Sequence, residues 1–224
     1  QREWLDLDLI LALALTPDGR MRHVSLTARE YEHADYPGRL KLAAASQECT
    51  ADTALNRFRC CRLTPFFDEV RAIKAALFLN AWIDHAGLPA LEDEFDTAAG
   101  QVLTAADQLA WLADAAAALA DALGMPPSLA ARAATLAERL TRGLREEALP
   151  LVRAARELSR AQAAALCEAG LCTPRALRRA SDAVLARAVP DPAARALRAW
   201  AEKQDPDADP AENRIITPPL IIVD

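Results

Sequence analysis

The sequence predicts an all-α fold, arranged as a helical bundle with a small helical unit at its C-terminal end. Three features of the composition favour helices over sheets: hydrophobic residues make up 52% of the chain and are largely alanine, aromatic residues make up only 5%, and only 7 of 224 residues are glycine. A chain of this length can bury one large core or two small ones.

The first element is ambiguous in its pattern. Leucines alternate with other residues from Leu5 to Leu15, which suits either a strand or a buried helix. The turn Thr16-Pro17-Asp18-Gly19 ends it, because proline fixes φ and glycine tolerates positive φ. A loop-rich stretch is expected up to about Pro37, followed by one or two helices between Arg39 and Arg62.

The middle of the chain predicts four helices, one of which is unusually long. Apolar residues recur at helical spacing, and Gly87, Gly124 and the Pro126-Pro127 pair interrupt them. Ser128 suits the N-cap of the fourth helix. The expected ranges are 66–85, 91–95, 97–123 and 129–145.

The C-terminal part predicts shorter helices and a tail. Ser159 and Thr173-Pro174 are typical of helix N-termini. The expected helices cover 146–157, 160–169, 175–187 and 191–200. The segment 204–224 is expected to be an acidic linker followed by the apolar stretch Ile215 to Val223, which packs on its own bundle or binds a protein partner.

Motifs of autonomous catalysis are missing from the sequence. It contains no GxxxxGK[ST] loop, no GxSxG elbow and no HExxH pair, and its three histidines and five cysteines lack the spacing of a metal site. The apolar runs Leu9–Leu15 and Ile215–Val223 are shorter than the roughly 20 residues that span a bilayer. We therefore expect a cytoplasmic chain that is not an enzyme by itself, with no cofactor, metal or membrane.

Charge is distributed unevenly along the chain, whose net charge is −6. Eight acidic residues and no basic residue lie between Asp84 and Asp121, whereas fourteen basic and eight acidic residues lie between Arg132 and Lys203. Only the second segment is suited to phosphate, although an arginine-rich solvated surface gives the same count.

The long central helix suggests a binding role. Gln101, Thr104, Gln108 and Trp111 are spaced three, four and three residues apart and so share one stripe, while apolar residues occupy most of the remaining circumference. Such a helix, buried on most sides, can line a channel where uncharged donors and an indole contact a nucleic-acid strand. The alternative is that Trp111 only fills the core.

An ordered series of segments from Thr16 to Trp200 resembles the C-terminal half of archaeal fork-unwinding superfamily-two DNA helicases of the Ski type, relatives of the helicase part of theta polymerase. The segments that carry the resemblance are 16–18, 72–83, 94–95 with Gly100, 110–112, 140–153 and 166–171. None of them is a specific motif alone, but their order and spacing agree with that family.

The resemblance implies an accessory region of a helicase. Residues 1–15 would end a preceding winged-helix or linker region, 16–150 would form a ratchet domain, and 151–203 a helix-hairpin-helix unit. Two motor domains before Gln1, where a piece of the chain is expected to be missing, would bind ATP and Mg²⁺. Single-stranded DNA and those motor domains would be the partners.

The family pattern also implies which residues contact DNA, and this sequence departs from it. Trp111 matches a stacking tryptophan, but the arginine expected one heptad earlier is Thr104, and the acidic residue expected after Gly100 is Gln101. The hairpin turn Arg156 to Arg160 lacks the glycines that bind phosphate through backbone N–H groups. Six arginines could compensate through their side chains: Arg153, Arg156, Arg160, Arg175, Arg178 and Arg179.

Two functions remain open from the sequence. The first is guidance of single-stranded DNA, with Trp111 stacking on bases and the arginines contacting phosphates. The second is a structural or protein-interaction domain that braces a motor or docks a partner after losing direct DNA contact, which the acidic charge near the long helix favours.

Overall fold

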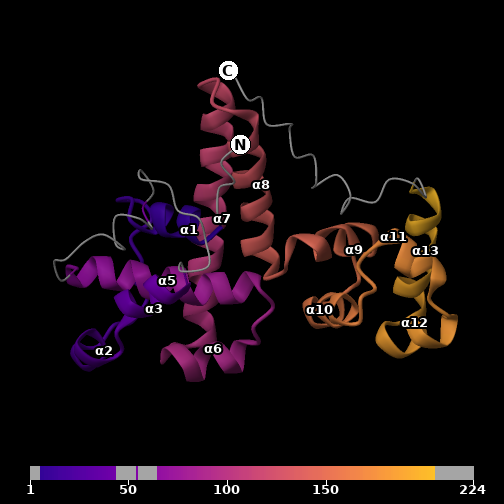
Figure 1. Ribbon diagram of the computed structural model, residues 1–224, viewed down its shortest axis with the longest axis horizontal. Helices are drawn as coiled ribbons and strands as arrows, with labels where there is room; N and C mark the ends of the chain where they lie inside the picture. Colours follow the sequence, from indigo (N-terminus) through magenta and orange to yellow (C-terminus); the bar gives the residue numbers. More distant parts are fainter. Residues whose placement is uncertain (1–5, 44–53, 55–64, 205–224) are drawn as a thin grey trace, which may run out of the picture. The chain divides into compact units, whose positions relative to one another are not determined.

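The computed structural model describes residues 6–43, 54 and 65–204, and every element in these ranges is helical, which confirms the all-α prediction. The chain divides into two compact units, residues 1–146 and 147–224 (Figure 1). The predicted boundary after Pro150 falls four residues from this division. The predicted linker and tail, 204–224, lie outside the described residues except for Gln204.

The ambiguous first segment forms a helix, α1 (Asp6–Ala14). Its buried residues Leu7, Ile10, Leu11 and Ala14 follow the spacing of one helical face and pack against α5. The alternating leucines therefore belong to a helix with one apolar face, and not to a strand. Helix α1 contributes to the core of the first unit.

Helix α2 (Ala28–His33) occupies part of the stretch predicted as a loop. A capping box starts it: the Glu30 N–H donates to Thr27 Oγ1, and the Thr27 N–H donates to Glu30 Oε2. The spacing of Thr27 and Glu30 is typical of a capping box and could have predicted this helix from the sequence. Helix α3 (Tyr36–Ala43) follows and contributes Tyr36 and Leu40 to the core.

Helix α5 (Phe67–Ile83) forms the centre of the first unit, as its apolar pattern predicted. Asp68 and Glu69 lie in its first turn, where carboxylates favour the positive end of the helix dipole. Helix α6 (Leu88–Phe95) follows and ends at Asp96, whose φ of 43° breaks the helix and redirects the chain into α7.

Helices α7 (Ala99–Ala122) and α8 (Pro127–Arg142) form an antiparallel hairpin whose far end projects beyond the other helices of the unit (Figure 1). Gly124, with φ of 65°, allows the chain to reverse. The predicted N-cap was wrong: α8 begins at Pro127, so Ser128 already lies inside its first turn.

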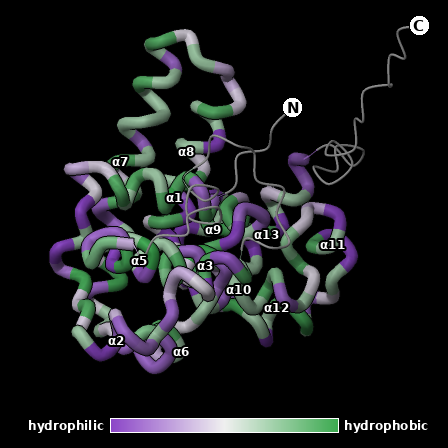
Figure 2. Tube along the Cα trace, turned by 60° about the vertical axis from the view of Figure 1, so that its left-hand side comes forward, coloured by the Kyte–Doolittle hydropathy of each residue, from purple (hydrophilic) through white to green (hydrophobic). Residues whose placement is uncertain are grey.

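Only one face of α7 is buried, which corrects the prediction of a helix buried on most sides. Its core face carries Val102, Ala106, Leu109 and Ala113, whereas Leu103 and Leu119 are exposed. Apolar residues recur along the length of the hairpin (Figure 2). By length and composition α7 could cross a membrane, but its core face packs against α1, α5, α6 and α8 of the bundle.

The described part of the second unit, up to Gln204, consists of five short α-helices around buried leucines. The short 3-10 turn η1 (Glu146–Ala148) leads into α9, and the unit's core includes Leu151, Leu166, Leu177 and Leu197. The predicted helix 175–187 is in fact two, because the chain bends at Ala180 and Ser181. The helices are α9 (Leu149–Ala154), α10 (Arg160–Glu168), α11 (Pro174–Arg179), α12 (Asp182–Ala188) and α13 (Asp191–Lys203).

Candidate nucleic-acid interface

The side of α7 opposite its core face is open to solvent and carries Trp111. The indole is 68% exposed, although tryptophan is a residue that proteins usually bury in large part. The residues that share this surface of the helix are also exposed. We call them the Trp111 face: Thr104, Asp107, Trp111, Asp114 and Ala118.

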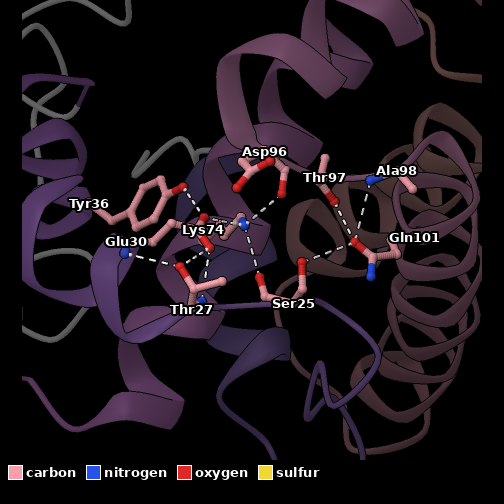
Figure 3. Close-up of polar contacts among 9 residues, drawn as sticks. All are labelled: Ser25, Thr27, Glu30, Tyr36, Lys74, Asp96, Thr97, Ala98 and Gln101. Carbon is pink, nitrogen blue, oxygen red and sulfur yellow. Dashed lines mark hydrogen bonds and ion pairs between the residues drawn. The ribbon is translucent and has the colours of Figure 1, made fainter.

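The beginning of α7 is fixed by a polar cluster around Lys74 of α5 (Figure 3). The Lys74 side chain is fully buried, and its ammonium group donates to the Ser25 carbonyl at 2.8 Å, to Glu30 Oε1 at 2.6 Å and to the Asp96 carbonyl at 3.3 Å. A buried ammonium group is tolerated when all its protons find acceptors. Lys74 therefore joins α5 to α2 and to the corner between α6 and α7.

Glu30 is held in its charged form within this cluster. It accepts hydrogen bonds from Lys74, from the Thr27 N–H and from the Tyr36 hydroxyl. Burial alone would raise the pKa of Glu30, but the hydrogen bonds from Lys74, Thr27 and Tyr36 outweigh it, and the pKa lies below its ordinary value. Burial raises the pKa of Tyr36, and its hydrogen bond to the Glu30 carboxylate raises it further.

Gln101 has an anchoring contact at the start of α7. Its side-chain oxygen accepts from Thr97 Oγ1 at 2.8 Å, from the Ala98 N–H at 3.4 Å and from Ser25 Oγ at 3.4 Å (Figure 3). It thus satisfies a backbone N–H that precedes the helix. This predicted DNA-binding residue holds the helix to the loop before α2.

Gln108 anchors the middle of the same helix. Its side-chain N–H donates to the Asp18 carbonyl at 2.7 Å, in the turn that follows α1. That turn is itself closed by Thr16 Oγ1, which donates to the Leu13 carbonyl and accepts from the Gly19 N–H. The predicted turn at Thr16 to Gly19 is confirmed, and it contacts α7 directly.

The predicted stripe therefore divides into two kinds of residue. Gln101 and Gln108 are half-buried anchors, and the Thr104 hydroxyl, although exposed, donates to the Gly100 carbonyl of its own helix. Trp111 alone of the four offers a large exposed surface. The predicted site did not include Asp107 and Asp114, which flank Trp111 one turn before and after it.

The predicted arginines all lie in the second unit, near the turn between α9 and α10 or on α11. Arg153 and Arg156 are exposed, and Arg160 is half-buried, which lowers the pKa of its guanidinium through desolvation. No residue described between 155 and 159 has a positive φ, so this turn lacks the alternating backbone of an anion nest. Ser159 and Gln162 instead cap α10 with a reciprocal pair of hydrogen bonds.

The three arginines of α11 differ in what they contact. Arg175 and Arg179 are exposed, whereas the Arg178 guanidinium donates to the carbonyls of Ala201 at 2.6 Å and Gln204 at 3.1 Å, at the C-terminus of α13. Arg198 of α13 makes the reverse contact, donating to the Leu177 and Ala180 carbonyls at the end of α11. Arg178 thus has a structural role in addition to the predicted one.

Within the described residues there is no group of three or more histidine, cysteine or acidic side chains placed to hold a metal ion. Of the residues that the sequence predicted to bind DNA, those exposed to a ligand are Trp111 and Thr104 in the first unit and Arg153, Arg156, Arg175 and Arg179 in the second.

Comparison with known proteins supports the resemblance. Residues 7–143 match the family model described as archaeal helicase, domain 4. The match covers most of the first unit, including α1, α5 and the α7–α8 hairpin. No curated protein matches the chain.

Proposed function

The chain belongs to the archaeal helicase domain 4 family, and on that premise we propose that it is an accessory region of a DNA helicase that guides single-stranded DNA during translocation. Bases stack on Trp111 in the first unit, and exposed arginines of the second unit contact phosphates. The motor domains of the parent protein, a cytoplasmic ATP-dependent helicase, bind ATP and Mg²⁺ and supply the energy, and the accessory region has no ATPase activity of its own.

The exposure of Trp111 is the observation that carries this proposal. An indole left in water loses the stabilisation that burial in the adjacent core would give, about 25 cal/mol for each Å² of apolar surface. Stacking of a base on an aromatic side chain contributes about 1–3 kcal/mol and does not depend on sequence. A translocating strand needs a contact of this strength, because a tighter one would hold the strand in place.

The anchors of α7 support the same role. Gln101 and Gln108 bind the helix to the loop before α2 and to the turn after α1, and the Lys74 cluster holds the corner before its first turn, so the indole is presented from an anchored helix. Rigid presentation lowers the entropy lost when a ligand binds.

A titration of the full chain with a fluorescein-labelled 12-nucleotide single strand, followed by anisotropy, tests the proposal. We expect the Trp111→Ala substitution to weaken binding about tenfold, and a rise in salt to weaken it steeply through the arginines. Leu119→Ala is the matched control, because Leu119 is an exposed apolar residue of the same helix outside the Trp111 face. Equal affinities of Trp111→Ala and the unsubstituted chain would remove the indole from the proposed function.

A second function, docking of a protein partner, is favoured by the end of the α7–α8 hairpin. Three apolar side chains there are strongly exposed: Leu119 at 61%, Leu123 at 74% and Met125 at 45%. Clusters of this kind mark protein contacts. The docking function predicts that Leu119→Ala combined with Leu123→Ala impairs helicase activity of the parent protein without changing oligonucleotide binding by the chain.

A further inference from the structure

The two carboxylates beside Trp111 have no structural use in the part of the chain that the structure describes. Asp107 and Asp114 are exposed, and among the described residues neither has a hydrogen bond or an ion pair. They precede and follow Trp111 by four and three residues, so both lie next to the indole, on the same side of it. On the other side, at the same spacings, are Gln108, which is bound to the Asp18 carbonyl, and the small Ala115.

We propose that Asp107 and Asp114 determine which bases stack on Trp111, by selecting those with an amino group on the Watson–Crick edge. This inference rests on the proposed function. A carboxylate only accepts hydrogen bonds, and in an unpaired strand the amino groups of cytosine, adenine and guanine are free to donate them. Uracil and thymine present two carbonyl oxygens on that edge, which a carboxylate repels, and their single donor, N3–H, lies between these oxygens.

The same carboxylates set the orientation of the strand across α7. Phosphates are repelled from the edge of the indole that Asp107 and Asp114 occupy, and α7 carries no Lys or Arg to offset this repulsion. The sugar–phosphate backbone therefore passes along the Gln108 and Ala115 edge. With the backbone there, the Watson–Crick edge of the stacked base points towards the carboxylates.

Binding of dC12 and dU12 to the full chain at pH 7.5 provides a direct test, because cytosine and uracil differ only where an amino group replaces a carbonyl and in the proton on N3. We expect dC12 to bind at least threefold more tightly than dU12. In the Asp107→Ala, Asp114→Ala double variant the ratio should fall to about one, while the affinity for dU12 rises because repulsion is removed. A purely structural role of the two residues would not raise any affinity.

A second double variant controls for the general loss of negative charge. Asp93→Ala with Asp121→Ala removes two exposed carboxylates from the same unit, on α6 and at the far end of α7. It should keep the dC12 to dU12 ratio of the unsubstituted chain. Loss of the ratio in this control, or its persistence in the Asp107, Asp114 variant, would overturn the inference.

The Trp111→Ala variant separates failure of this inference from failure of the proposed function. If it weakens both oligonucleotides but the unsubstituted chain does not discriminate between them, only the base selection is wrong. If it weakens neither, stacking itself is wrong. A labelled hexa-arginine peptide tests whether the Trp111 face binds a basic protein segment instead. If the chain binds this peptide through Asp107 and Asp114 and binds no oligonucleotide, both the base selection and the proposed function are wrong.

Discussion

The ammonium nitrogen of Lys74 lies 2.6 Å from Glu30 Oε1, and the Lys74 side chain has no exposed surface. The pair joins α5 to α2, and through the Asp96 carbonyl it also holds the corner from which α7 starts. Loss of this buried pair should therefore lower the stability of the first unit, and protonation of Glu30 should do the same.

Replacing Lys74 with methionine should destabilise the first unit by about 3 kcal/mol, because the nearly buried Glu30 carboxylate loses its partner. Urea denaturation followed by circular dichroism measures this change. The double variant Lys74→Met, Glu30→Gln should recover part of the loss, since no uncompensated charge remains. The control is Asp68→Asn, which removes a mostly exposed carboxylate from its pair with Arg71, where we expect a change below about 0.5 kcal/mol.

Acid should weaken the first unit through Glu30. Its folded-state pKa is lowered, so the unfolded chain binds this proton more readily, and the stabilisation is present above the unfolded pKa, about 4.3. It is lost progressively as the pH falls through the folded pKa. The free energy of unfolding, measured between pH 6 and pH 3, should therefore decrease less in Glu30→Gln than in the unsubstituted chain; parallel curves would contradict the assignment.

The two tryptophans Trp82 and Trp111 should differ strongly in how much stability the same substitution removes. Trp82 is buried, and its indole N–H donates to the Leu140 carbonyl at 2.8 Å, in the last turn of α8 where carbonyls lack intrahelical partners. Trp82→Phe leaves that carbonyl unsatisfied and should cost about 2 kcal/mol. Trp111→Phe should change stability by less than about 0.5 kcal/mol, because its ring is mostly in solvent. Chemical denaturation of both variants compares them directly.

The sequence predicted the helices where local signals were strong. The pattern of α5, the proline and glycine at the end of α7, and the Ser159 cap of α10 are all local, and the structure has helices at each. The missed α2 also had a local signal, the Thr27–Glu30 capping box. The break before α12 also had a local signal, because Ser181 is the N-cap of that helix and Asp182 lies in its first turn, but no proline or glycine marks it.

The sequence predicted the site less well than the helices, because it does not show what each side chain contacts. Helical spacing placed Gln101, Thr104, Gln108 and Trp111 on one stripe but could not show what each side chain contacts. Gln101 contacts its neighbours Thr97 and Ala98, but its contact with Ser25 and the contact of Gln108 with Asp18 join α7 to a distant segment, and only the folded chain brings that segment to α7. Exposure of Trp111 likewise depends on which face of α7 the other helices cover.

Substitutions of the neighbouring arginines Arg178 and Arg179 of α11 should have different effects, the first on the stability of the second unit and the second on DNA binding. Arg178 donates to carbonyls at the end of α13, where a cation also interacts favourably with the helix dipole, so Arg178→Gln should destabilise the unit by about 1–2 kcal/mol. Arg179 is exposed, so Arg179→Gln should leave stability unchanged and weaken oligonucleotide binding, with a smaller salt dependence. Thermal denaturation and anisotropy titrations of both variants measure the two effects. If Arg178→Gln were as stable as the unsubstituted chain, the reciprocal contact with α13 would contribute nothing to folding, and its guanidinium would count among the phosphate contacts instead.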